Sequence, residues 1–235
     1  LSLAKTKERE ELKSFLGDKE GLLSWKLDGL TIVLTYNDGE LTKAVTRGNG
    51  EVGEVITNNA KVFKNIPLKI TFKGELILRG EAVITFSEFE RINMTIAAEE
   101  LKYKNPRNLC SGTVRQLNNK VTAERNVRFY AFNLIKADGF DAENKKENEF
   151  IFLSQLGFEV VEFNHEKEKN ILETVEHYAN KIMDYDIPSD GLVLTYDDIA
   201  YGQSLGRTAK TPRDSIAFKW ADETCETTLK EIEWS

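Results

Sequence analysis

The chain has little cysteine, histidine or proline, and it has no long apolar run. Its 235 residues include two cysteines, two histidines and four prolines. The cysteines, Cys110 and Cys225, form no CxxC pair, so the sequence predicts neither a disulfide scaffold nor a structural zinc site. No apolar run reaches the length of a membrane span, and the first residues are not a signal peptide. We therefore expect a cytoplasmic protein with free thiols and no membrane partner.

An initiator methionine is also missing, so we expect a fragment of a longer chain. Acidic residues outnumber basic ones, 39 to 32, and the resulting net charge of -7 disfavours a surface that binds nucleic acid everywhere. The basic residues are nevertheless concentrated, because residues 101–130 hold seven of them against one acid. One basic segment in an acidic protein can place a polyanion at one face, but the same charges also suit a solvated helix surface. Both interpretations stay open at this point.

Predicted strands occur in hairpins and clusters, with helices between them at irregular intervals. The plainest hairpin joins 30–36 to 41–46 through Asn37-Asp38-Gly39, a turn that favours positive φ. Further strands are expected at 75–84, 127–135, 158–163, 191–196, 216–220 and 229–234. Helices are expected at 8–16, 51–63, 87–98 with Ser87 as N-cap, 106–117 and 169–183. This order favours an α+β fold with antiparallel sheets over a doubly wound parallel sheet.

The four residues Lys26-Leu27-Asp28-Gly29 stand between two apolar stretches and are the most informative local motif. Free lysine is almost entirely protonated at neutral pH, so a nucleophilic lysine needs nearby cations or desolvation and a fixed geometry. Gly29 would let another group approach the backbone closely. A strand that ends in a turn with a solvated lysine explains this short motif at least as well on its own.

Charged residues inside apolar strands are a second indication of a site. Arg79-Gly80-Glu81 lies within the expected strand 75–84, and Lys219 lies within 216–220. Such groups are disfavoured unless they face water, a partner or a ligand. If Lys219 faces the same region as Lys26, both cations would neutralise phosphate charge in a transition state. The alternative for Arg79 and Glu81 is a salt bridge on an edge strand.

Residues 48–53 match GxGxxG, but no regular βαβ succession follows, so we interpret them as a loop that presents Arg47 rather than a dinucleotide-binding turn. Arg107 and Arg115 lie eight residues apart in one expected helix. Guanidinium groups placed there would suit phosphate.

Several sequence blocks occur in one order: KLDG, TRGNGEVGEVITNN, LRGE, NPRNLCSGTVRQL, SDGLVL and IAFKW. Together they resemble the adenylation (nucleotidyltransferase) domain of bacterial NAD-dependent DNA ligases. NPRNLCSGTVRQL and IAFKW are typical of the NAD-using branch. The resemblance implies a nucleotidyltransferase fold of antiparallel sheets flanked by helices, with the active site in a cleft between two subdomains. It also implies that 1–228 form the adenylation domain and that 229–235 begin a truncated OB-fold.

The resemblance further implies a reaction in which Lys26 takes AMP from NAD as a lysyl-AMP phosphoramidate. AMP then passes to the 5′-phosphate of nicked double-stranded DNA, and the nick is sealed with Mg²⁺ present. The protein would serve DNA repair and replication as a monomer. The implied catalytic residues are Lys26, Asp28 and Lys219. The implied nucleotide-binding residues are Ser2, Leu3, Lys26, Arg47, Glu81, Phe132, Asp190 and Lys219. Arg107 and Arg115 would bind phosphates of nucleotide and DNA, and Asp28 and Glu81 would bind the metal.

Four positions depart from the family's pattern. Thr195 replaces a lysine, Ser24 replaces an acid, and Asn49 replaces an aspartate. An arginine expected shortly before Asp190 has no counterpart nearer than Lys181. These departures leave open a catalytically impaired domain that binds nucleotide or DNA without adenylating itself. An ATP-using RNA ligase or capping-type transferase would keep the reactive lysine but leave the NAD-branch blocks unexplained. We expect that this fragment cannot seal nicks alone.

Overall fold

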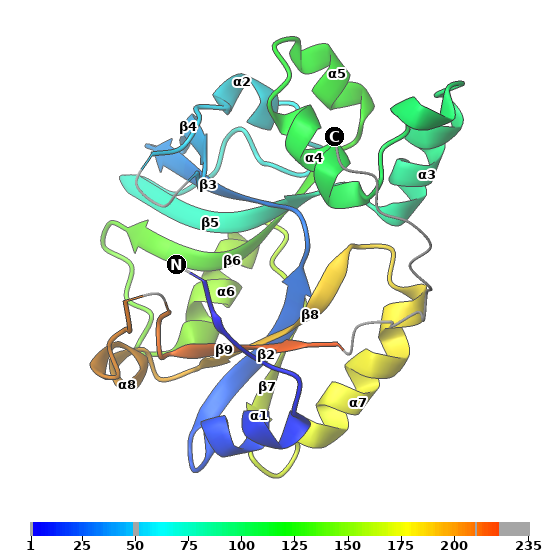
Figure 1. Cartoon of the computed structure of the whole chain (residues 1–235). Coiled ribbons are helices and arrows are strands. Elements are labelled where there is room, and N and C mark those ends of the chain that lie inside the picture. The colour runs from blue at the N-terminus through cyan, green and yellow to red at the C-terminus, as the bar shows by residue number, and fades with distance from the viewer. Residues whose placement is uncertain (1, 49–51, 210, 221–235) are drawn as a thin grey trace, which may run out of the picture.

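The computed structural model describes residues 2–48, 52–209 and 211–220, which form two β-sheets with helices against them (Figure 1). The four-stranded sheet has the order β4-β3-β5-β6, and the five-stranded sheet has the order β1-β9-β8-β2-β7. Its strands are β3 Leu30–Asn37, β4 Glu40–Thr46, β5 Glu75–Val83 and β6 Arg128–Ala137 in the first sheet. Those of the second are β1 Ala4–Thr6, β2 Glu20–Leu27, β7 Phe163–Lys167, β8 Ser189–Tyr196 and β9 Ser215–Lys219. The α+β class is confirmed, with one parallel pair, β1 with β9, among antiparallel ones.

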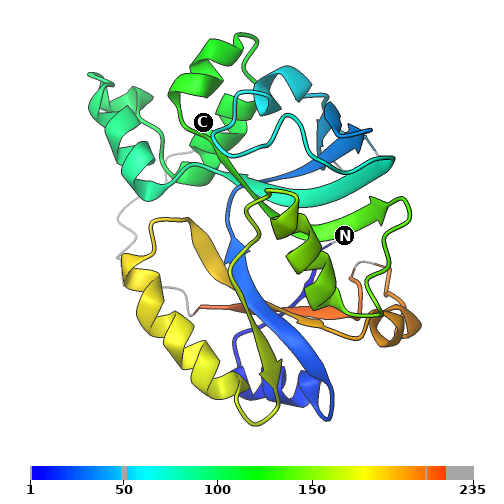
Figure 2. The same ribbon diagram turned by 180° about the vertical axis from the view of Figure 1, so that it is seen from behind.

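The helices lie on the outer faces of the sheets and between them (Figures 1 and 2). The four-stranded sheet is accompanied by α2 Thr57–Ala60, α3 Phe86–Met94, α4 Pro106–Val114 and α5 Asn119–Glu124. The five-stranded sheet is accompanied by α1 Arg9–Leu16, α7 Ile171–Lys181 and α8 Ile199–Ser204. Two 3₁₀ turns are η1 Glu99–Leu101 and η2 Ile182–Asp184.

Each sheet has its own hydrophobic core, and α6 Lys146–Gln155 contributes to both. Phe150 packs in the core of the five-stranded sheet, whereas Leu153 packs in the core of the four-stranded sheet. A helix that buries two sides does not show a single apolar stripe. Its place between the two cores therefore explains why the sequence of α6 gives a weak helical periodicity.

Alternation along β5 decides which side chains are available for a site. Leu76, Leu78 and Ala82 are fully buried in the core under the helices, whereas Arg79 and Glu81 point to the opposite face. That inner face is turned toward the five-stranded sheet (Figure 1). Because β5 pairs with β3 on one side and β6 on the other, Arg79 and Glu81 lie on a central strand and not on an edge.

The chain crosses from one sheet to the other between Leu27, the last residue of β2, and Leu30, the first residue of β3. Asp28 and Gly29 form this crossing. A Cβ atom built on Gly29 would lie 2.0 Å from the carbonyl oxygen of Ala82, so a side chain cannot fit there. The expectation of a close approach at Gly29 is confirmed, and the approaching group is the backbone of β5.

Several expected boundaries are wrong. The strand expected at 158–163 is an irregular segment joined to β6 by an isolated bridge, and β7 begins at its end. Because β7 is an edge strand with exposed side chains, its sequence is polar and lacks the pattern of a buried strand. The helix expected at 51–63 is reduced to the single turn α2. Thr85, rather than Ser87, caps α3. The strand expected at 229–234 and the OB-fold start lie outside the described residues.

The NPRN block forms the start of α4 as an N-cap followed by proline. The Asn105 side chain accepts a hydrogen bond from the backbone N–H of Asn108 at 2.8 Å, and Pro106 occupies the first turn. We expect Asn105→Ala to lower the free energy of unfolding by about 1 kcal/mol, because a backbone donor loses its partner. Urea denaturation measures the loss. Asn105→Asp should retain most of the stability, and an equal loss in both variants would contradict the capping role.

Candidate active site

Lys26 and Asp190 are brought together by an irregularity in the pairing of β2 with β8. Lys26 lies opposite Gly191 and Leu27 lies opposite Ser189, so Asp190 is an extra residue between two paired positions. A bulge of this kind bends the strand and turns a side chain toward a new direction. The Lys26 amine donates a hydrogen bond to Asp190 Oδ1 at 2.6 Å. The Ser189 hydroxyl supports the bulge by donating to the carbonyl oxygen of Lys26 at 2.9 Å.

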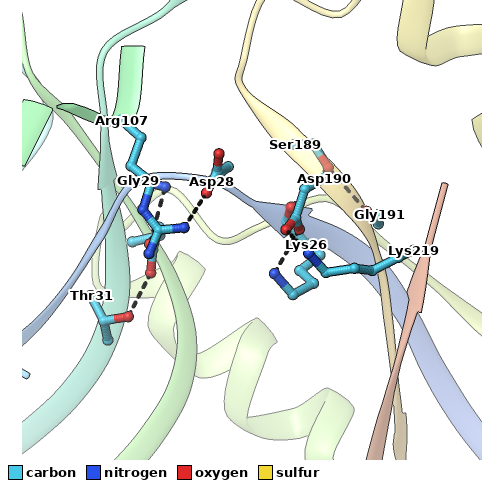
Figure 3. A network of polar contacts seen from close by, with 10 residues as sticks. Lys26, Asp28, Gly29, Thr31, Arg107, Ser189, Asp190, Gly191 and Lys219 are labelled. Atoms are coloured by element: carbon cyan, nitrogen blue, oxygen red, sulfur yellow. Dashed lines mark hydrogen bonds and ion pairs between the residues drawn. The ribbon is translucent and has the colours of Figure 1, made fainter. Parts of the chain in front are cut away.

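Lys219 reaches the same carboxylate from β9. Its amine donates to Asp190 Oδ2 at 2.7 Å, so one carboxylate holds both amines (Figure 3). Burial alone would raise the pKa of Asp190, but hydrogen bonds and charges from Lys219 and Lys26 outweigh it and lower that pKa. The close pairing of β8 with β9 requires Gly191, since a Cβ there would lie 1.9 Å from the carbonyl oxygen of Phe218. The predicted convergence of the two lysines is therefore present in the structure.

A second group of polar contacts surrounds Asp28 and Gly29, where the chain crosses from β2 to β3 (Figure 3). Asp28 binds Arg107, the second residue of α4, at 2.7 Å. Glu81 on β5 accepts hydrogen bonds from the Gly29 N–H at 3.2 Å and from the Thr31 hydroxyl at 2.9 Å. Burial raises the pKa of Glu81 to about 7, although these two bonds and the nearby cations act in the opposite direction.

The remaining expected site residues lie at different distances from these contacts. Arg47 follows β4, and its backbone N–H donates to the Thr31 carbonyl at 3.0 Å, which places it beside the second group. Phe132 on β6 is partly buried and packs against the core of the five-stranded sheet. Ser2 and Leu3 precede β1, whose register with β9 places them at the opposite end of β9 from Lys219.

Arg115 does not join the lysine cluster. Its guanidinium binds Glu54 and the side chain of Ser111, and its Nη1 also donates to the Ser111 carbonyl at 3.1 Å. Arg107 and Arg115 therefore have separate carboxylate partners, although both come from α4 and its C-cap. The structure does not bring them to one phosphate position.

The positions that depart from the family's pattern carry hydroxyl groups with partners inside the protein. Thr195 Oγ1 lies 3.0 Å from Ser215 Oγ, and Ser24 Oγ donates to the Val193 carbonyl at 3.4 Å. Lys181 pairs with Glu162 at 2.6 Å and does not join the Lys26 cluster. Asn49 lies outside the described residues. The described site thus has no charge at positions 24 and 195.

Sequence reasoning missed the contribution of Thr31. This residue follows Gly29 by two positions in a strand, so it lies on one face of the sheet with other inward side chains. The signal that would have found it is this alternation, combined with pairing of Thr31 opposite Glu81. The local sequence pattern does not show the register in which two distant strands pair, so the contact between Thr31 and Glu81 was not expected.

Within the described residues, no group of three or more metal-ligating side chains is placed to hold a metal ion. Asp28 is engaged by Arg107, and Glu81 is engaged by Gly29 and Thr31. A Mg²⁺ ion that is held mainly by the phosphates of a ligand needs few protein carboxylates. Asp28 and Glu81 fit an ion of that kind. Among the same residues, no helix combines the length and apolar character needed to cross a bilayer.

Comparisons with known proteins identify relatives along the whole chain. A family model described as the NAD-dependent DNA ligase adenylation domain matches residues 3–223. The chain is 63% identical over 235 residues to a DNA ligase of Lachnoclostridium phytofermentans and 62% identical over 235 residues to one of Ruminiclostridium cellulolyticum. Each alignment covers 100% of this chain and 36% of the relative, so the chain spans little more than a third of their length.

Solved structures with low sequence identity share the fold. An archaeal ATP-dependent RNA ligase superposes with a TM-score of 0.54 at 13% identity, over 94% of this chain and 48% of that one. A putative ATP-dependent DNA ligase from Aquifex aeolicus superposes with a TM-score of 0.53 at 11% identity, over 94% and 49%. These likenesses confirm the expected nucleotidyltransferase fold. The family match favours the NAD-using branch over the ATP-using alternative.

The raised pKa of Glu81 predicts a specific pH dependence of stability. It is about 7 in the folded chain, against about 4.3 for an unperturbed glutamate in an unfolded chain. Between these values the folded state holds more protons than the unfolded state, so Glu81 makes stability fall as the pH rises through this range and adds no slope above it. We expect Glu81→Gln to remove this fall, as measured by urea denaturation at a series of pH values. Exposed Glu100→Gln is the control, and an unchanged slope in Glu81→Gln would contradict the assignment.

Proposed function

Because this chain belongs to the family of NAD-dependent DNA ligase adenylation domains, we propose that it carries AMP from NAD on Lys26. The observation that supports this most directly is the convergence of Lys26 and Lys219 on the two oxygens of Asp190. Two amines held on one carboxylate are also placed to hold one phosphate. The step requires a neutral amine, so the Lys26 ammonium first gives a proton to water, and the nitrogen gives up a second proton to water once the bond to phosphorus has formed.

In the proposed first step, the lone pair of Lys26 Nζ forms a bond to the α-phosphorus of NAD. The bond from that phosphorus to the bridging oxygen breaks, and nicotinamide mononucleotide leaves with the electron pair. Lys219 neutralises charge that develops on the α-phosphate oxygens. Asp190 is ionised at neutral pH because its pKa is lowered, so it orients both amines through charged hydrogen bonds. A bound Mg²⁺ ion would supply further neutralisation of phosphate charge.

The positions around the crossing have separate proposed roles. Asp28 positions Arg107 toward phosphate, and Glu81 together with Arg47 holds the ribose and phosphate of the nucleotide. Phe132 stacks on adenine, and Ser2 and Leu3 border the adenine site. Support for the Glu81 role comes from its contacts with Gly29 and Thr31, which place its carboxyl group next to the Lys26 motif.

In the later proposed steps, AMP passes to the 5′-phosphate of a nick in double-stranded DNA, and the 3′-hydroxyl then displaces AMP. Arg107 and Arg115 would contact phosphates, as part of the basic segment 101–130. We further propose residues 1–228 as the adenylation domain, a monomeric state, a cytoplasmic location and no membrane partner.

The second candidate is a domain that binds nucleotide or DNA without adenylating itself. Its support is the uncharged side chains of Ser24 and Thr195, which stand where the family's pattern has an acid and a lysine. Both candidates have the same fold and belong to the same family. They differ in one measurable product, because only the first forms a covalent adduct with AMP.

Intact mass spectrometry after incubation with NAD or ATP separates the candidates. We expect an AMP adduct from NAD and not from ATP, because the family is NAD-dependent. Lys26→Ala should abolish the adduct, and peptide mapping of the wild type should place it on Lys26. Lys13→Ala, a change on the exposed surface of α1, is the control. An adduct on another residue would contradict the role of Lys26, and no adduct with binding retained would favour the second candidate.

The basic segment generates a prediction about DNA. Arg107→Ala and Arg115→Ala should each weaken binding to nicked duplex and lower the slope of log affinity against log salt by about 1. Glu54→Gln should act in the opposite direction, because Glu54 competes with phosphate for Arg115. Fluorescence anisotropy at several salt concentrations measures these effects. Unchanged slopes in both arginine variants would show that neither residue contacts DNA phosphate.

A further inference from the structure

Arg79 is a cation of the inner face for which the reaction proposed above has no role. Four side-chain atoms among the described residues are buried without a hydrogen-bond partner: Arg79 Nε, Arg128 Nε, Glu166 Oε2 and Trp220 Nε1. The other arginine has a carboxylate, since Arg128 Nη2 binds Glu159 at 2.7 Å. No described residue gives Arg79 a side-chain hydrogen bond or an ion pair. A buried unsatisfied donor requires an explanation.

The position of Arg79 is set by β5. It precedes Glu81 by two residues on the same face, a separation of about 7 Å along the strand. Its neighbours across the sheet are Val33 on β3 and Asn133 on β6, and neither carries negative charge. The Asn133 side-chain oxygen already accepts a hydrogen bond from Lys146 at 2.6 Å. Neither directly paired neighbour therefore offers Arg79 an acid.

Arg47 supplies a second guanidinium to this sheet, since its backbone pairs with Thr31, which lies opposite Glu81. Burial lowers the pKa of Arg79, and the charge of Arg47 lowers it further. Arg47 is exposed and is connected to the Glu81 network through Thr31. Two neighbouring cations that lack a described carboxylate repel one another and leave a partly buried charge uncompensated. An anion bound to both guanidinium groups would offset both costs.

We propose that Arg79, together with Arg47, binds a phosphate of the dinucleotide substrate during the adenylation step. This inference rests on the proposed function and adds a binding residue to it. A dinucleotide suits the site better than a DNA strand does, because Arg79 is partly buried within a central strand. It also lies on the face that carries Glu81, whose carboxyl group contacts the backbone next to the Lys26 motif. A small diphosphate reaches such a position, whereas a duplex presents its phosphates to exposed side chains.

The test compares wild type with Arg79→Met by isothermal titration calorimetry, using NAD, inorganic pyrophosphate and adenosine as separate ligands. Methionine keeps the length of the side chain and removes its charge. We expect NAD and pyrophosphate to bind at least about tenfold more weakly, because a charged hydrogen bond is lost. Adenosine carries no phosphate and should bind with unchanged affinity. Arg79→Lys should recover part of the lost affinity for pyrophosphate.

Stability without ligand separates a binding role from a structural one. An uncompensated cation destabilises the folded chain, so Arg79→Met should melt at the same temperature as wild type or higher. Adding pyrophosphate should raise the melting temperature of wild type more than that of the variant. Arg91→Met is the matched control, because Arg91 is exposed on α3 and pairs with Glu88 at 2.7 Å. Its affinities should equal those of wild type.

Three results would overturn the inference: unchanged affinity for NAD and pyrophosphate in Arg79→Met, an equal loss of adenosine binding with a lower melting temperature, or weaker binding of nicked DNA alone. Failure of the proposed function has a different signature. It consists of a wild type that forms no AMP adduct from NAD, together with an Arg79→Met variant that still binds pyrophosphate more weakly than the wild type does. In that case the anion site stands, and the assignment of NAD as the AMP donor is wrong.

Discussion

The paired hydrogen bonds of Lys26 and Lys219 to Asp190 are the interaction on which the rest of the site depends. They require three strands of the five-stranded sheet in a particular register, with a bulge that inserts Asp190 between paired positions. Gly191 permits the close approach of β8 to β9. The two ammonium partners lower the pKa of Asp190, so its carboxylate is ionised and holds both amines before any ligand arrives.

The site uses both sheets because the chain crosses between them immediately after Lys26. Asp28 and Gly29 carry the backbone from β2 to β3, and Gly29 places it against β5. Glu81 then joins the two sheets through its bond to the Gly29 N–H. Carboxylates pair with Lys26, Lys219 and Arg107 in the described structure, so a phosphate that binds these three would replace one set of anionic partners with another. This exchange limits the net gain from each ion pair and favours binding that depends on several contacts.

The fold was predictable in segments where the local sequence pattern and the packing in the folded chain favour the same secondary structure. The hairpin through Asp38-Gly39 formed as expected, because its turn chemistry and its alternation point to the same structure. The segment 158–163 misled prediction because its apolar residues fill the core without forming a strand, while polar β7 forms one at a sheet edge. The KLDG motif and the lysine of β9 indicated a shared site. The pairing of Arg115 with Glu54 was not predictable, because spacing along a helix does not reveal which carboxylate a side chain meets.

If the amines of Lys26 and Lys219 act on one phosphate, the rate of adduct formation in Lys219→Met tests this most directly. With NAD present at saturating concentration, rapid-quench intact mass spectrometry measures how fast AMP attaches to Lys26. We expect Lys219→Met to bind NAD and retain Lys26 but to form the adduct at least about a hundredfold more slowly, because transition-state charge is left unneutralised. Adduct formation at the wild-type rate would contradict it.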